Sequence, residues 1–138
     1  MMVALPDDFR ESPLIGIEYL VEIVEGDRGE LGKPSYRCEL SSTVLKEADD
    51  VVPYLVSANH RLNYLKRFYP TAYQKFSKGT VPNVESWNPK TFQFLESVIM
   101  RIENKNGRLR PQVVASDATY QKTRANIRRK IETGQHFR

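Results

Sequence analysis

Cysteine and histidine are scarce in this chain of 138 residues, which has one cysteine, Cys38, and two histidines. A single cysteine excludes a disulfide within the chain, so nothing indicates a small secreted fold held by cross-links. Long apolar runs are also missing, since no stretch approaches the roughly 20 apolar residues that span a bilayer as a helix. The first residues are acidic where a signal peptide needs basic ones. We therefore expect an intracellular protein, nuclear or cytoplasmic, with no membrane partner.

Recognisable catalytic motifs are absent as well. No Ser-His-acid or Cys-His-acid order stands in a known surrounding motif, and no Gly-rich phosphate loop follows an expected strand. The acidic pairs Asp7 with Asp8 and Asp49 with Asp50 lie in expected loops or helix starts, where capping accounts for them. We therefore predict that the protein is not an enzyme and needs no cofactor.

The chain has an ordinary globular composition, with 40% hydrophobic and 28% charged residues, but its charge is unevenly distributed. Residues 1–58 carry 12 acids and 5 bases, a formal charge of −7, whereas residues 59–138 carry 5 acids and 16 bases, a formal charge of +11. A basic half attracts phosphate backbones and acidic protein surfaces alike. The charge leaves both partners open, together with a basic surface that is merely solvated.

The order of apolar and polar residues predicts an α+β fold. Residues 13–25 favour a helix because their glutamates follow the helical period, although the apolar residues also alternate and leave a strand open. Residues 35–46 predict a β-hairpin, and residues 49–68 a helix that ends before Pro70. Residues 71–88, rich in Pro, Gly, Ser and Thr, predict an irregular connector. Helices are expected over 89–104 and from near Ser116.

Four positions on the hairpin and the following helix have the spacing of a zinc finger. Cys38, Ser41, Tyr54 and His60 are separated by two, twelve and five residues, as are the two Cys and two His of a ββα finger. Ser41 and Tyr54 are not ordinary zinc ligands, and Cys38 with His60 alone would bind zinc weakly. We therefore expect vestigial positions and no metal. In the alternative interpretation Cys38 is a small buried apolar residue and His60 a capped or surface residue of a helix.

The segments YRCELS and YLVSANHRLNYLKRFYP resemble a matrin-type two-Cys-two-His zinc finger in a degenerate form that has lost two of its four ligands. The resemblance is most specific in HRLNYLKRFYP. It implies a nuclear setting, because members of that family are mostly nuclear and bind RNA, often double-stranded, or act in splicing and transcription assemblies.

A finger of this size that lacks its metal cannot bury enough apolar surface alone, so the flanking helices must supply it. We expect a zinc-finger-like β-hairpin plus helix, packed with these helices into a single domain, 1–138. Within it, residues 12–70 form the degenerate ββα unit with its preceding segment, residues 71–88 the connector, and residues 89–132 a helical extension.

The expected function is that of a non-catalytic interaction module, which scaffolds protein–protein contacts in a nuclear RNA-processing or gene-silencing assembly. The alternative is direct binding of RNA, or less readily DNA, through the basic C-terminal half, where bases and aromatics are interleaved. The aromatic residues can equally belong to the core, and the lysines and arginines to a solvated surface. The candidates for contact with nucleic acid or a protein partner are Arg61, Tyr64, Lys66, Arg67, Lys75, Lys78, Lys122, Arg124, Arg128, Arg129 and Lys130.

Overall fold

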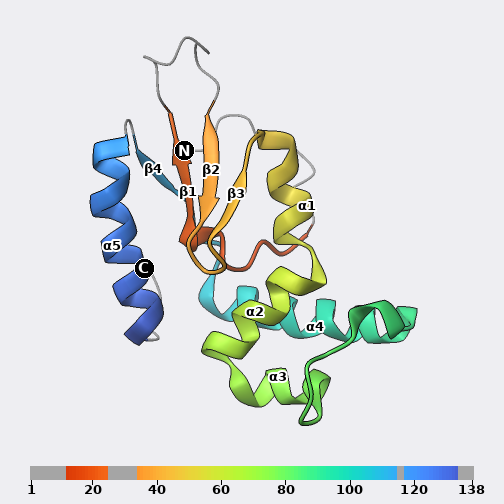
Figure 1. Cartoon of the computed structure of the whole chain (residues 1–138). Helices are drawn as coiled ribbons and strands as arrows, with labels where there is room; N and C mark the ends of the chain where they lie inside the picture. Colours follow the sequence, from red (N-terminus) through yellow and green to blue (C-terminus); the bar gives the residue numbers. More distant parts are fainter. Residues whose placement is uncertain (1–11, 25–33, 115–116, 134–138) are drawn as a thin grey trace.

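The computed structural model describes residues 12–24, 34–114 and 117–133, and these form an α+β fold, as predicted (Figure 1). A mixed sheet has the strand order β3-β2-β1-β4, in which β1 is antiparallel to β2 and parallel to β4. The strands are β1 Leu20–Ile23, β2 Ser35–Cys38, β3 Thr43–Leu45 and β4 Gln112–Val114. The helices are α1 Val51–Leu55, α2 Ala58–Phe68, α3 Pro70–Ser77, α4 Pro89–Asn106 and α5 Asp117–Thr133. Short 3-10 turns cover Ile17–Tyr19, Ala48–Asp50 and Val84–Ser86.

The two faces of the sheet are covered by different helices. Figure 1 shows α5 and α1 on opposite sides of the sheet, with α2, α3 and α4 beyond one end of it. Val21 and Ile23 of β1 pack with Ile127 of α5, whereas Tyr36 and Cys38 of β2 belong to a cluster with α1. Cys38 is fully buried, as its apolar interpretation predicts. None of the described helices is both long and apolar enough to cross a bilayer.

The helix favoured for residues 13–25 is wrong, because this segment contains a 3-10 turn and β1. Every residue of β1 is buried, since the sheet is covered on both faces. The glutamates that suggested a solvated helical face are buried too. Glu22 accepts a hydrogen bond from the Tyr36 hydroxyl at 2.8 Å, and Glu18 is only 4% exposed.

The hairpin, α4 and α5 were predicted correctly, but the single helix over 49–68 is wrong. The chain breaks between α1 and α2 at Ser57, whose extended backbone and side chain cap α2 by accepting the His60 N–H at 3.3 Å. The connector is irregular only after Ser77, because Pro70 starts α3 as its first residue. Strand β4 was not predicted, since three residues give too short a pattern.

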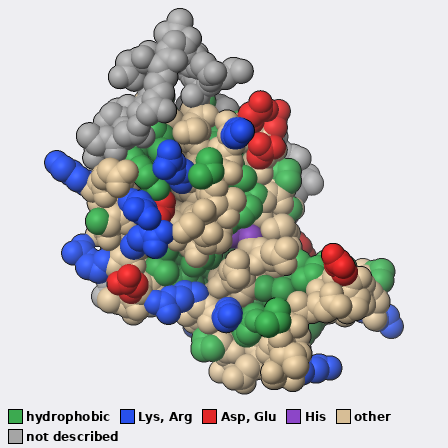
Figure 2. Space-filling view, in the orientation of Figure 1, with side chains coloured by type: hydrophobic (Ala, Val, Ile, Leu, Met, Phe, Trp, Pro, Cys, Tyr) green, Lys and Arg blue, Asp and Glu red, His purple; other side chains and the backbone are tan. Residues whose placement is uncertain are grey.

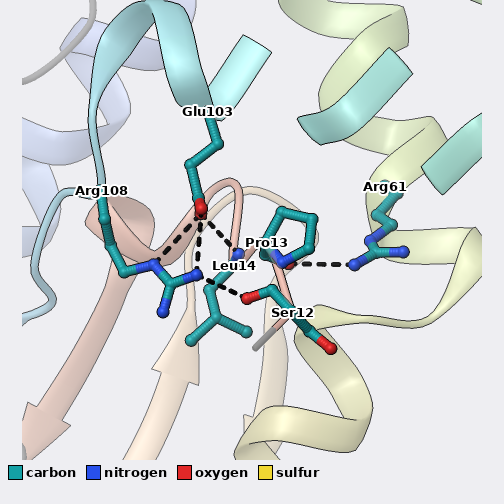
Figure 3. Close-up of polar contacts among 6 residues, drawn as sticks. All are labelled: Ser12, Pro13, Leu14, Arg61, Glu103 and Arg108. Carbon is teal, nitrogen blue, oxygen red and sulfur yellow. Dashed lines mark hydrogen bonds and ion pairs between the residues drawn. The ribbon is translucent and has the colours of Figure 1, made fainter. Parts of the chain in front are cut away.

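The segment before β1 is held by side chains that bind its backbone (Figure 3). Glu103 of α4 accepts the Leu14 N–H at 2.7 Å, and Arg108, which pairs with Glu103, donates to the Ser12 carbonyl at 2.6 Å. Arg61 of α2 donates to the Pro13 carbonyl at 3.0 Å. The segment therefore joins α2 and α4 to the start of the sheet.

Candidate nucleic-acid interface

The four positions with zinc-finger spacing lie close together in the structure, where their polar groups bind one another or the backbone. The Ser41 and Tyr54 hydroxyl oxygens lie 2.5 Å apart, and the rings of Tyr54 and His60 are 4.8 Å apart between centroids. His60 Nε2 lies 2.7 Å from the Ile15 carbonyl oxygen, to which it donates. Among residues 12–24, 34–114 and 117–133, no group of three or more His, Cys, Asp or Glu side chains is arranged to hold a metal ion.

Burial decides the chemistry of this cluster. It lowers the pKa of His60 to about 4 and raises the pKa of the Cys38 thiol, so at neutral pH both groups are uncharged. A protonated thiol is a poor nucleophile and a poor metal ligand. His60 is only 1% exposed, so its interpretation as a surface residue is wrong. The cluster joins the hairpin, α1 and α2 as a structural element.

Two of the predicted contact residues are not accessible. Arg61 is 5% exposed and pairs with Glu96 at 2.6 Å besides binding the Pro13 carbonyl, and Tyr64 is 1% exposed in the aromatic core. Their prediction as partner-binding residues is wrong, because the sequence of α2 could not reveal the segment that covers Arg61 or the core around Tyr64. Neither a phosphate nor a base can reach these two side chains.

A hollow of about 280 Å³ lies between α5 and the β2–β3 hairpin. Arg37 of β2 is the register partner of Val21 and of Val44, so it lies on the face of the sheet against which α5 packs. Tyr120, Arg124 and Arg128 of α5 form the opposite wall. The Arg37 guanidinium carbon is 4.8 Å from the centroid of the Tyr120 ring, a cation–π geometry. We call this space the arginine pocket.

A buried carboxylate, Glu39, lies in the wall of the arginine pocket. It accepts hydrogen bonds from the Tyr120 hydroxyl, from Arg124 Nε at 3.1 Å and from Arg128 Nε at 3.2 Å. Burial, and then the bond to Glu39, raise the pKa of Tyr120, so its hydroxyl remains a donor. Since three guanidinium groups face one carboxylate, the pocket has a net charge of about +2 at neutral pH.

Two further hollows extend the basic surface toward α2 and α3. One, of about 500 Å³, is lined by Lys66 and Arg67 together with Ile131 of α5, whose carbonyl accepts from Arg67 Nε at 2.8 Å. The other, of about 450 Å³, is lined by Lys75 beside the half-buried ring of Tyr69. Figure 2 shows basic side chains gathered over α5 and the neighbouring hairpin. We call the three hollows together the basic face.

The basic face contains part of the predicted set and adds to it. Of the predicted residues, those that line the three hollows are Lys66, Arg67, Lys75, Arg124 and Arg128. Lys78, Lys122 and Arg129 are exposed and line none of them, and Lys130 is half-buried. Arg37 and Tyr120 were missed. The alternation of Tyr36, Arg37 and Cys38 placed Arg37 opposite the buried side chains, but no local pattern indicates that α5 lies over it.

Comparisons of this chain with models of protein families, with curated proteins and with solved structures give no match. Its interpretation therefore depends on the geometry of the basic face.

Proposed function

We propose that this protein is a non-catalytic RNA-binding module that holds the phosphates of a strand along its basic face. The observation that carries the proposal is the contact of Arg67 with the Ile131 carbonyl, by which the end of α2 and the end of α5 line one hollow. Basic residues far apart in sequence thereby lie along a single surface. A surface of this kind suits a polyanion better than an isolated charge.

The chemistry of the face favours phosphate over bases. Arginine guanidinium groups match phosphate oxygens in two-pronged hydrogen bonds, and lysines add charge. Lys66 Nζ lies 6.0 Å from the centroid of the Tyr73 ring, and the rings near Lys75 are half-buried, so little ring surface is available for stacking on bases. We therefore propose affinity for the strand with weak preference for its sequence. The preference for RNA over DNA rests on the resemblance to matrin-type fingers.

A salt titration tests the proposal. Fluorescence anisotropy with single-stranded RNA, double-stranded RNA and duplex DNA should give binding that weakens linearly in log–log form with salt, with a slope of about 0.7 to 0.9 per contacted phosphate. Lys66→Ala and Lys75→Ala should each lower the slope by about one contact. Lys90→Ala and Arg101→Ala, on exposed positions of α4, serve as controls that leave it unchanged. Absent binding, or binding insensitive to salt, contradicts the proposal.

A second candidate is the protein-scaffolding function expected from the sequence, and an aromatic cluster favours it. Phe76 lies 5.2 Å from Phe94 and Trp87 lies 5.1 Å from Phe92 between ring centroids. Phe92 and Phe94 are 43% and 45% exposed near the start of α4. Exposed clusters of this kind are typical of protein contacts.

The scaffolding candidate predicts a protein partner in nuclear extract that is lost when Phe92→Ser and Phe94→Ser are combined. The same partner should be retained by Lys66→Ala with Lys75→Ala, which weaken the RNA contact instead. Retention by the serine double variant contradicts an aromatic contact.

A further inference from the structure

We propose that the arginine pocket binds the terminal phosphomonoester of an RNA strand. The inference rests on the proposed function, because it assigns one end of the bound strand to one hollow of the basic face. The remaining hollows would hold internal phosphates through Lys66, Arg67 and Lys75.

Charge is the first argument for a monoester. Three guanidinium groups and the Glu39 carboxylate leave an excess of about two positive charges in the pocket. A phosphate monoester carries about −1.5 to −2 at neutral pH, since its second pKa is near 6, whereas an internal diester carries −1. The terminal phosphate therefore neutralises the pocket, and an internal phosphate does so only in part.

Unused donors are the second argument. Each guanidinium has five N–H donors. Within the described residues, Arg124 uses Nε for Glu39, while Arg128 uses Nε for Glu39 and Nη2 for Ser42 Oγ at 2.8 Å. Arg37 Nε is buried without a hydrogen-bond acceptor among those residues. A buried donor without an acceptor is rare and costly, so the guanidinium of Arg37 has hydrogen-bonding capacity that the described residues do not use.

An internal ion-pair network is the alternative explanation for these residues. It accounts for Glu39, which is 3% exposed and compensated by Arg124 and Arg128. It accounts less fully for Arg37, which interacts with Tyr120 but pairs with no carboxylate among the described residues and lies beside an open hollow. Ser42 also lines this hollow, and its hydroxyl, which accepts from Arg128 Nη2, can donate to an anion. The arrangement of these groups suits the binding of a dianion.

The test compares one RNA sequence with a 5′-phosphate, with a 3′-phosphate and with hydroxyls at both ends. The wild-type protein should bind one phosphorylated form about tenfold more tightly than the hydroxyl form, as expected for charge-assisted hydrogen bonds from arginine. Arg37→Gln should reduce this difference to less than about twofold, and Arg37→Lys, which keeps the charge but not the planar fork, should retain part of it. Arg101→Gln, on α4, should retain all of it.

Thermal unfolding of each variant, with inorganic phosphate against chloride at equal ionic strength, separates the two proposals. Phosphate should raise the melting temperature of wild type and not that of Arg37→Gln. RNA that binds equally well with and without a terminal phosphate overturns the pocket assignment and leaves the proposed function standing. If inorganic phosphate stabilises the protein but RNA does not bind, both the assignment of the pocket to an RNA end and the proposed function are overturned. Tighter binding of a phosphoserine peptide than of phosphorylated RNA also overturns the assignment.

Discussion

Gly16 shows how closely the segment before β1 fits against α2. Its φ of +84° lies in the left-handed region, and a Cβ atom placed there would be 2.8 Å from His60 Nε2. The imidazole cannot retreat without losing its hydrogen bond to the Ile15 carbonyl. Both the backbone conformation and the neighbouring side chain therefore require glycine at this position.

Gly16→Ala should lower the free energy of unfolding by about 2–4 kcal/mol, which combines a left-handed alanine with a steric conflict in the core. Gly79→Ala is a matched control, because Gly79 has a φ of +86° but no atom within 4 Å of the added Cβ. The control should cost only about 1 kcal/mol. Urea denaturation followed by the fluorescence of Trp87 measures both. Equal losses would mean that contact with His60 contributes nothing.

Glu18 and His60 make opposite contributions to the pH dependence of stability. Burial raises the pKa of Glu18 from 4.5 to about 7, so its contribution is full below pH 4.5 and is lost as the pH rises to about 7. Burial lowers the pKa of His60 from 6.5 to about 4, so its contribution is full above pH 6.5 and is lost as the pH falls to about 4. Between pH 4.5 and 6.5 the two effects offset each other.

Glu18→Gln should therefore expose the effect of His60. Relative to wild type, the free energy of unfolding of the variant should decrease on going from pH 7 to pH 4.5, by on the order of 1 kcal/mol per pH unit. Glu85→Gln, at an exposed position, is the control and should follow the wild-type profile. Urea denaturation at half-unit pH intervals gives the comparison. A constant difference between Glu18→Gln and wild type would show that Glu18 titrates normally.

At the scale of elements, hydroxyl groups join the hairpin to α1. The Ser41 hydroxyl contacts the Tyr54 hydroxyl at 2.5 Å and that of Thr43 at 2.8 Å. Tyr54 in turn packs on His60 of α2. The hairpin is therefore connected to two helices by neutral side chains.

A double-mutant cycle of Ser41→Ala and Tyr54→Phe measures this connection. Each single change should cost about 1–2 kcal/mol, and the double variant less than the sum, with a coupling of about 1 kcal/mol. Denaturation in the presence of a strong chelator should give the same free energies as without it. A drop in stability on chelation would indicate that a metal contributes to the fold after all.

The sequence predicted those helices and strands whose signals are local. The hairpin and α4 have local signals, namely alternation and the Asn88 cap, which accepts the Thr91 N–H at 3.0 Å. Strand β1 has an alternation too, but its glutamates favoured a helix, because their burial comes from tertiary contacts that the local sequence does not indicate. The break at Ser57 was not predicted. Serine is a common N-cap, but apolar residues continue at helical spacing on both sides of it, which favoured one long helix.

At the scale of the whole molecule, the division of charge in the sequence is not the division in space. Arg37 belongs to the acidic half of the chain and lines the arginine pocket, while Arg61 of the basic half is buried against Glu96. Figure 2 shows acidic side chains on the side opposite α5, over the beginning of α1. The candidate site could be predicted only as a list of bases, because the packing of α5 on the sheet decides which of them lie together.

The order of the three hollows leads to a prediction about strand length. A strand whose end is held by three arginines should bind the arginine pocket first, because this hollow has the highest charge, and should reach Lys75 on α3 only when it is long enough. Lys75→Ala should then leave the affinity of short terminally phosphorylated oligonucleotides unchanged. For longer ones it should lower the salt slope by about one contact.

Anisotropy titrations over a series of oligonucleotide lengths measure this dependence, with Lys90→Ala as the control at an exposed position of α4. An equal loss at every length would mean that Lys75 acts through the general field of the protein, since only a direct contact requires the strand to extend that far. The length at which Lys75→Ala first takes effect reports how much of the strand lies along the basic face.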